Sequence, residues 1–383
     1  MSERPPNIRH YAALAATVRH GSLTRAARAV NLTQPALTQA IAGLEASLGV
    51  TLFDRSASGM AATGPALLLA PRAEAAIARI GSSRVTGTQV QAFLAVARAG
   101  SYAGASQATG LSGASLHRAV AHLCVALGQR LIDRRGRTIM LTPVGERRLR
   151  GFGLAMAELR AGLAEIAAWQ GKIGGRIVIG AMPLSRARWL PEAISRFAAS
   201  HPGVDLAVVE GSYAELCGPL RNGDLDMILG ALREGAEADD LAQERVFVDR
   251  PQIIMRSGHP LLARQEAHGA LLDYSWILPG RDTPLRRYWE AMMAGIGEAV
   301  PHVGIECGSV MTIRQLLLSG DALTLLSPDQ VSVELAAGLL AALAPPVAVE
   351  RTIGITTRAG WRPTATQTAL LDRLRTTGSG FHQ

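Results

Sequence analysis

Apolar side chains recur at intervals of three and four residues along the first third of the chain, which predicts amphipathic helices over 8–20 and 23–30. A third helix begins after Thr33, which can cap it. Its apolar stripe is spaced for burial on one face and consists of Leu37, Ile41, Leu44 and Leu48. The opposite face carries Gln34, Thr38 and Gln39. The pattern predicts a helix that offers polar groups to a ligand; a solvated face on a helical bundle is the alternative interpretation.

The same arrangement recurs 79 residues further along the chain without a gap. The matching pairs include Gly21 with Gly100, Asp54-Arg55 with Asp133-Arg134, and Thr63 with Thr142. Alanine richness does not explain matches of Gly, Asp, Arg and Thr, so we interpret the segment as a duplication. Each copy is predicted to contain three helices and a hairpin, which is the order of a winged helix-turn-helix unit.

The two copies differ at the positions that face outward. The second recognition helix, over 112–127, keeps its apolar stripe but carries Gly113-Ala114 and His117-Arg118 where the first carries Gln34-Pro35 and Thr38-Gln39. Its hairpin is strongly basic, with three arginines over 134–137, whereas the first hairpin is nearly uncharged over 56–60. We therefore expect different base preferences, and expect each copy to retain a different part of the contact surface.

A heptad seam follows the second hairpin, with apolar residues spaced alternately three and four apart. Its members are Leu149, Phe152, Met156, Leu159, Leu163 and Ile166. This seam predicts dimerisation through a partner helix, and hence a homodimer or homotetramer. The stretch after the first hairpin has a weaker seam over 70–80, which favours a connector that packs within the chain.

From 174 onward short apolar strands alternate with amphipathic helices. Strands are predicted over 176–180, 204–209, 227–230, 252–255 and 302–305. This alternation indicates an open α/β sheet architecture, in which ligands bind beyond the carboxyl ends of strands.

The net charge of +8 is unevenly distributed along the chain. Residues 1–171 contain 19 arginines and 8 acidic residues, a net charge of +11, and the remainder carries −3. A basic segment joined to a mildly acidic one is typical of a polyanion binder attached to a domain with another task, although a solvated basic surface has the same composition.

Composition also limits the compartment and the chemistry. No signal-like start and no run of about 18 apolar residues is present, which predicts a soluble cytoplasmic protein. The odd and widely spaced cysteines Cys124, Cys217 and Cys307 favour core thiols over disulfides or a metal site. We find no catalytic constellation, phosphate loop or metal-ligand cluster, so neither an enzyme nor a cofactor is expected.

The run over 32–55 closely resembles the DNA-binding signature of LysR-type regulators, including Phe53-Asp54-Arg55 at the start of the wing. The resemblance implies double-stranded DNA as a partner, with helix residues at the major groove and the wing arginine near the backbone. The residues implied in the first copy are Thr33, Gln34, Pro35, Thr38, Gln39 and Arg55. The corresponding candidates in the second copy are Ser112, Ser115, His117, Arg118, Arg134, Arg135 and Arg137.

The distal half, from about 174 to 376, resembles the LysR-type effector domain. The pieces over 180–184, 209–211 and 283–287 are especially similar to a subgroup that contains sugar-responsive and aromatic-acid-responsive regulators. The resemblance implies two α/β lobes, like those of periplasmic binding proteins, with a small organic effector between them. Candidate contacts lie in loops at the expected cleft: Pro183, Leu184, Ser185, Gly280, Arg281, Thr283, Ser309 and Val310. Arg281 can neutralise an anionic effector such as an organic acid or sugar acid, and a solvated loop arginine is the alternative interpretation. Ser185, Thr283 and Ser309 can cap helices instead of binding a ligand.

The expected organisation comprises five segments. They are a first winged helix-turn-helix over 1–64, a connector over 65–86, a second winged unit over 87–142, a dimerisation helix over 143–172 and an effector domain over 173–378. Lobe 1 is expected over about 174–238 and 340–378, and lobe 2 over 239–339. Alternatives are a thiol redox sensor using Cys217 or Cys307 and a solute-binding protein. RNA polymerase is a further partner if the chain is an activator.

Overall fold

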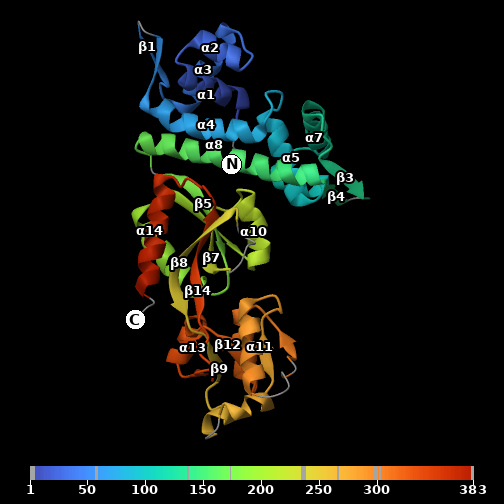
Figure 1. The fold of residues 1–383 in the computed structure, drawn as a ribbon, viewed down its shortest axis with the longest axis vertical. Coiled ribbons are helices and arrows are strands. Elements are labelled where there is room, and N and C mark those ends of the chain that lie inside the picture. The colour runs from blue at the N-terminus through green and yellow to red at the C-terminus, as the bar shows by residue number, and fades with distance from the viewer. Residues whose placement is uncertain are drawn as a thin grey trace.

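The computed structural model describes residues 5–56, 59–135, 138–172, 174–233, 239–264, 267–296, 301 and 303–380. Figure 1 shows two helical units on a pair of long helices, with two α/β lobes beneath them. This architecture confirms the predicted fold class, with two winged helix-turn-helix units, a long helix and a two-lobe effector domain.

The first unit contains α1 (Ile8–His20), α2 (Leu23–Ala29), α3 (Gln34–Leu48) and the hairpin of β1 (Phe53–Ser56) and β2 (Gly59–Ala62). α1 ends because Gly21 adopts a left-handed φ of 59°, which a residue with a side chain rarely adopts. Thr33 caps α3 by accepting a hydrogen bond from the Ala36 amide. The stripe residues Leu37, Ile41 and Leu44 are buried, as their spacing predicts.

The second unit repeats this order with α5 (Gly87–Ala99), α6 (Tyr102–Thr109), α7 (Gly113–Leu127), β3 (Ile132–Arg135) and β4 (Thr138–Leu141). Ser112 caps α7 by accepting from the Ser115 amide at 3.2 Å. Leu116, Val120 and Leu123 are buried beneath it. The duplication therefore holds at the level of structure as well as sequence.

Two long helices lie between these units and run antiparallel: α4 (Gly64–Ile80) and α8 (Pro143–Trp169). Gly64, at the start of α4, lies against the Trp169 indole at the end of α8. At the opposite end, Arg148 donates to the Ile80 carbonyl oxygen at 3.2 Å. The contacts thus pair the start of each helix with the end of the other (Figure 1).

The heptad seam is filled within the chain, which corrects the expectation that a second chain covers it. Phe152, Met156, Leu159 and Ile166 are at most 6% exposed, and Leu149 and Leu163 are half-buried. α4 packs along α8, and Phe93 of α5 makes an edge-to-face contact with Phe152 at 5.9 Å between ring centroids. Heptad spacing specifies an apolar face but not the helix that covers it.

Lobe 1 is a five-stranded mixed sheet in the order β6-β5-β7-β14-β8. Its strands are β5 (Gly175–Ala181), β6 (Val204–Glu210), β7 (Met227–Ala231), β8 (Leu241–Asp249) and β14 (Arg351–Arg358). β5 is parallel to β6 and β7, whereas β14 is antiparallel to β7 and β8. Its helices are α9 (Trp189–Ser200), α10 (Tyr213–Arg221) and α14 (Ala365–Ser379).

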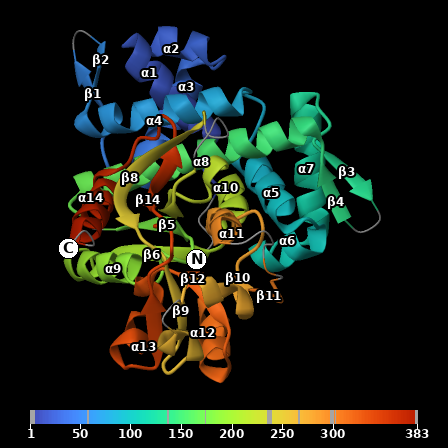
Figure 2. The same cartoon turned by 60° about the horizontal axis from the view of Figure 1, so that its bottom comes forward.

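Lobe 2 has a second five-stranded sheet in the order β11-β10-β12-β9-β13. Its strands are β9 (Gln252–Arg256), β10 (Trp276–Leu278), β11 (Ile305–Glu306), β12 (Leu323–Leu326) and β13 (Leu340–Leu343), and its helices are α11 (Pro284–Ile296), α12 (Val310–Ser319) and α13 (Ser332–Ala336). The strand expected over 302–305 is thus short, and residue 302 lies outside the described residues. Figure 2 shows this lobe below lobe 1.

Both crossovers between the lobes lie further along the chain than expected. β8 extends lobe 1 to Asp249, and β13 belongs to lobe 2, so the chain crosses at 250–251 and again at 344–350. The expected boundaries at 239 and 340 are therefore corrected. β8 escaped detection because only some of its side chains are buried, so its sequence lacks a continuous apolar run.

Lobe 1 is docked on the helix pair. A Cβ at Gly153 of α8 would collide with the Asn222 carbonyl oxygen, and Arg160 of α8 donates to the Gly223 carbonyl oxygen at 3.0 Å. Arg98 of the second helical unit forms an ion pair with Asp224 in the same turn. No helix in the described part of the chain has the length and apolar character needed to span a bilayer.

Candidate functional site

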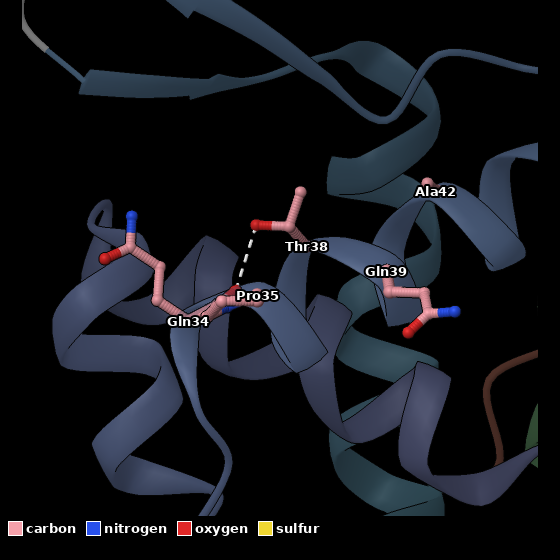
Figure 3. Close-up of a pocket in the computed structure, with 5 residues that line it drawn as sticks. All are labelled: Gln34, Pro35, Thr38, Gln39 and Ala42. Atoms are coloured by element: carbon pink, nitrogen blue, oxygen red, sulfur yellow. Dashed lines mark hydrogen bonds between the residues drawn. The ribbon is translucent and has the colours of Figure 1, made fainter.

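The outward face of α3 presents amide groups over an open depression of about 480 Å³ (Figure 3). Gln34, Pro35 and Gln39 are exposed and line it together with Thr38 and Ala42. The Thr38 hydroxyl donates to the Gln34 backbone carbonyl oxygen at 3.0 Å, and the Gln34 side-chain oxygen accepts from the Thr24 hydroxyl at 3.4 Å. The Gln34 amide nitrogen and the Gln39 amide are then the main outward hydrogen-bonding groups. This face can form paired hydrogen bonds with base edges.

The outward face of α7 is chemically different. His117 and Arg118 are both exposed and occupy the positions that match Thr38 and Gln39. The His117 ring lies 5.4 Å from the Tyr102 ring, between centroids, so α6 restrains the imidazole. Ser112 donates its hydroxyl hydrogen to the Ser115 hydroxyl at 2.9 Å. The face therefore offers a guanidinium and an imidazole where α3 offers neutral amides.

The wings follow these helices directly. Arg55 lies in β1 opposite Met60, and Arg134 and Arg135 lie in β3 opposite Ile139 and Thr138. Arg137 falls outside the described residues. The strands thus place three of the four predicted wing arginines within hairpins, and their DNA contacts remain predictions.

In lobe 2 the sheet brings two predicted effector loops together. β10 and β11 are parallel and adjacent, so the loops that follow them leave the same edge. Gly280 lies close to the Glu306 carboxylate, and Thr283 accepts from the Arg286 amide at the start of α11. Arg281 is exposed.

The other loop leads into α12. Ser309 is exposed and caps that helix by accepting from the Thr312 amide, and Val310 is half-buried at the first helical position. Thr283 and Ser309 are therefore helix caps, and their roles toward an effector remain predictions.

The predicted loop of lobe 1 is turned inward, which corrects the expectation that it faces an open cleft. Ser185 is fully buried and donates to the Met182 carbonyl oxygen at 2.8 Å, and Leu184 belongs to the lobe 1 core. Pro183 is half-buried. The loop does follow the carboxyl end of β5, but its tight turn directs these side chains into the lobe.

The structure identifies two arginines that the sequence analysis missed, Arg186 and Arg188. Arg188, in the same turn, lies 3.7 Å from the Asp329 carboxylate of lobe 2, so this ion pair joins the lobes. A hydrogen bond to Glu192 is the main contribution that raises the pKa of Arg188, and burial raises the pKa of Asp329. The nearby Arg186 pairs with Glu210 at the end of β6. The sequence does contain a pattern that points to these two arginines, because both lie in the segment Ser185-Arg-Ala-Arg188 directly after the first strand.

The cysteines give little support to redox chemistry. Cys217 is 5% exposed within a core cluster of lobe 1, and Cys307 is half-buried near the Ser309 carbonyl oxygen in lobe 2. Burial is the main cause that raises the pKa of the neighbouring Tyr213 to about 12, and a hydrogen bond with Cys217 adds to that rise. No group of three or more potential metal ligands occurs among the described residues.

Family models match both halves of the chain. The model described as "Bacterial regulatory helix-turn-helix protein, lysR family" matches twice, over 8–66 and 88–146. The model described as "LysR substrate binding domain" matches residues 170–379. The two separate matches to the first model coincide with the two helical units of the structure.

Relatives of known sequence support the same assignment. The HTH-type transcriptional regulator GalR of Pseudomonas putida is 32% identical over 386 residues, covering 97% of this chain and 97% of its own length. The regulator PcaQ of Agrobacterium fabrum is 29% identical and covers 76% of this chain and 94% of its own.

Solved structures show the same fold. ArgP of Mycobacterium tuberculosis has a TM-score of 0.58 at 17% identity, covering 76% of this chain and 97% of its own. Full-length OxyR of Pseudomonas aeruginosa has a TM-score of 0.56 at 24% identity, covering 76% and 98%. The chain therefore belongs to the LysR family of transcriptional regulators, and carries the DNA-binding unit of that family twice and its effector-binding domain once.

Proposed function

We propose that this regulator contacts double-stranded DNA through the exposed faces of α3 and α7 and through the arginines of both wings. The carrying observation is that each recognition helix is fixed by a buried apolar stripe and a capped amino end while its polar face stays open. Such a helix keeps its donors and acceptors in one orientation, which base-edge recognition requires.

Two variants separate base reading from backbone contact. Replacing Gln34 and Thr38 by Ala is expected to relax sequence preference, because base-edge contacts specify. Replacing Arg134, Arg135 and Arg137 by Ala is expected to weaken specific and nonspecific binding alike, and to reduce the slope of log affinity against log salt by up to about 3. Both effects are measured by titrating full-length protein onto specific and unrelated duplexes at several salt concentrations.

The matched control removes three positive charges from the effector domain by replacing Arg196, Arg250 and Arg264, which are all exposed, with Ala. Its salt slope should stay close to that of the parent. Unchanged specificity in the Gln34 and Thr38 variant would show that α3 does not read bases, and an unchanged slope in the wing variant would remove the backbone role.

We infer that the effector is an organic acid or sugar acid bound where the lobes meet. Arg188 of lobe 1 lies at this junction, beside Asp329 of lobe 2, and Arg186 lies in the same turn beside Glu210. Arg281 of lobe 2 is exposed in a loop that the sequence predicts to contact the effector, and helix amino ends such as those of α11 and α12 favour an anion. LysG of Corynebacterium glutamicum, which has this fold with a TM-score of 0.51, was solved with bound effector Arg. An effector that contacts both lobes can change how lobe 1 rests on α8.

A panel of organic acids, sugar acids and neutral sugars tested by thermal shift on the full chain is expected to contain a stabilising acid. A ligand at 100 times its Kd adds about 2.7 kcal/mol to the folded state. Arg281→Ala and Arg188→Ala should each reduce that shift, whereas Arg264→Ala, an exposed arginine of lobe 2, should not. Stabilisation by neutral sugars alone would contradict the anion, and a response only to oxidants would favour redox sensing through Cys217 or Cys307.

A homodimer or homotetramer remains a prediction, as do action in the cytoplasm and contact with RNA polymerase by an activator. Because the seam over 149–166 is occupied within one chain, we propose that any association of chains uses another surface.

A further inference from the structure

We propose that one chain reads both halves of its operator in cis, and that the two halves are unlike, one specified by glutamines and the other by an arginine. The inference rests on the proposed DNA contacts of α3 and α7. It goes further because it assigns both reading heads of one site to a single chain and gives each head its own base chemistry. A reading head here is one winged helix-turn-helix unit with its recognition helix, α3 or α7.

The antiparallel helix pair sets the spacing of the two heads. α4 starts just after the first wing, at Gly64, and that end lies against Trp169, the last residue of α8. α8 starts at Pro143, just after the second wing. At 1.5 Å per residue, the two wings are separated by roughly 40 Å along α8. This separation is similar to one turn of B-DNA, about 34–36 Å, which separates adjacent half-sites.

Side-chain contacts fix each head to the pair. Gln170, just beyond α8, donates its amide hydrogen to the Leu48 carbonyl oxygen at the end of α3, at 2.9 Å. At the other end, Arg148 of α8 donates to the Gln129 side chain of the second unit at 3.0 Å and also to the Ile80 carbonyl oxygen. The two heads are therefore held in a defined arrangement, unlike two domains on a flexible tether.

A central ion network strengthens the same pair. Arg72 of α4 is 5% exposed and contacts Glu158 at 3.1 Å and Glu165 at 2.6 Å, both on α8. Holding two heads in register raises the local concentration of the second head once the first has bound, which increases affinity without any new contact. A chain built in this way does not need a second chain to complete a two-headed reader.

The exposed faces then determine what each head selects. Glutamine pairs with the N6 and N7 groups of adenine, whereas arginine pairs with the O6 and N7 groups of guanine. Gln34 and Gln39 are the exposed amides of α3, and Arg118 beside His117 is the exposed cation of α7. A symmetric reader would carry the same side chains on both helices, so this chain is built for a site without two-fold symmetry.

The test selects duplexes from a random-sequence pool with the full-length parent and with two variants, Gln34→Ala/Gln39→Ala and His117→Ala/Arg118→Ala. The parent is expected to select two unlike halves about one helical turn apart. Each variant should lose selection in one half only, with a roughly 5- to 150-fold loss of affinity, the range for one bidentate base contact. Copying α3 onto α7 with His117→Thr/Arg118→Gln should make the two halves more alike.

Co-expression of the two alanine variants distinguishes cis from trans. In cis, every chain lacks one working head, so the mixture should bind the parental site no better than either variant alone. Restored parental affinity would overturn the proposal, since it would require heads from two chains, and so would a palindromic site on which both variants alter both halves equally. Failure of the parent to enrich any sequence would instead overturn the proposed DNA contacts themselves.

Discussion

Replacing Leu159 with Asp is expected to lower the free energy of unfolding by about 4–5 kcal/mol, among the largest effects of a single substitution. Leu159 is 2% exposed and lies in the core cluster shared by α4, α8 and both helical units. The substitution removes buried apolar contacts and places a carboxylate in an apolar core, where a charge is strongly disfavoured. Urea denaturation followed by circular dichroism measures the change.

Two controls distinguish a charge in the core from a general effect on the helix pair. Leu159→Met keeps the volume and should cost less than about 1.5 kcal/mol. Leu67→Asp places the same charge on α4 at a side chain that is 58% exposed, and should change stability by no more than about 0.5 kcal/mol. If Leu159→Asp changes only the sedimentation coefficient and leaves chain stability intact, the seam is an interface between chains after all.

Arg72→Met is expected to lower the free energy of unfolding by about 3–5 kcal/mol, because it breaks a buried ionic cluster. Glu165 then loses its ion pair with Arg72, and Glu158 keeps only its pair with the more exposed Arg362. Arg72 also donates to the Arg362 carbonyl oxygen at 2.9 Å, so one side chain joins α4, α8 and lobe 1. Burial alone would lower the pKa of Arg72, but hydrogen bonds to Glu165 and Glu158 outweigh it and raise that pKa. Denaturation and amide hydrogen exchange in α4 report the loss.

The matched control is Arg19→Met, which breaks an ion pair between Arg19 of α1 and Glu74 of α4, the helix that carries Arg72. Those side chains are 65% and 38% exposed, so the cost should stay below about 1 kcal/mol. Arg72→Lys keeps the charge but not the planar fork that bonds Glu165 twice, and should fall between the two. Parental stability in Arg72→Met would show that the cluster does not hold the pair together.

Local patterns predicted the helical units well because their information is contained in short segments. The spacing of Leu37, Ile41 and Leu44 identifies both the helix and its buried side, and Thr33 marks where it begins. The repeat at an offset of 79 residues then extended these assignments to α7 without further evidence. The outward residues of both recognition helices followed directly, since a helix with a known buried side has a known exposed side.

Long-range packing was predicted less well. The seam on α8 is visible in the sequence, but half of the buried residues of α4 are alanines, including Ala73 and Ala76, so α4 looked like a weak partner. Small residues suit close helix packing: a Cβ at Gly162 of α8 would lie 2.6 Å from Leu69 of α4. In open α/β sheets ligands bind beyond the carboxyl ends of strands. This rule located the loop that contains Ser185, but it did not predict that the Ser185 side chain points into the lobe.

The pairing of α4 with α8 inside one chain also affects how operator and regulator can change together over time. In an assembly of two identical chains, each substitution in a recognition helix appears twice and requires compensating changes in both half-sites at once. In this chain a codon change in α7 leaves α3 untouched. The base sequence of one half-site can then change while the other half-site keeps its contacts with α3. New target promoters can therefore be acquired by single mutations.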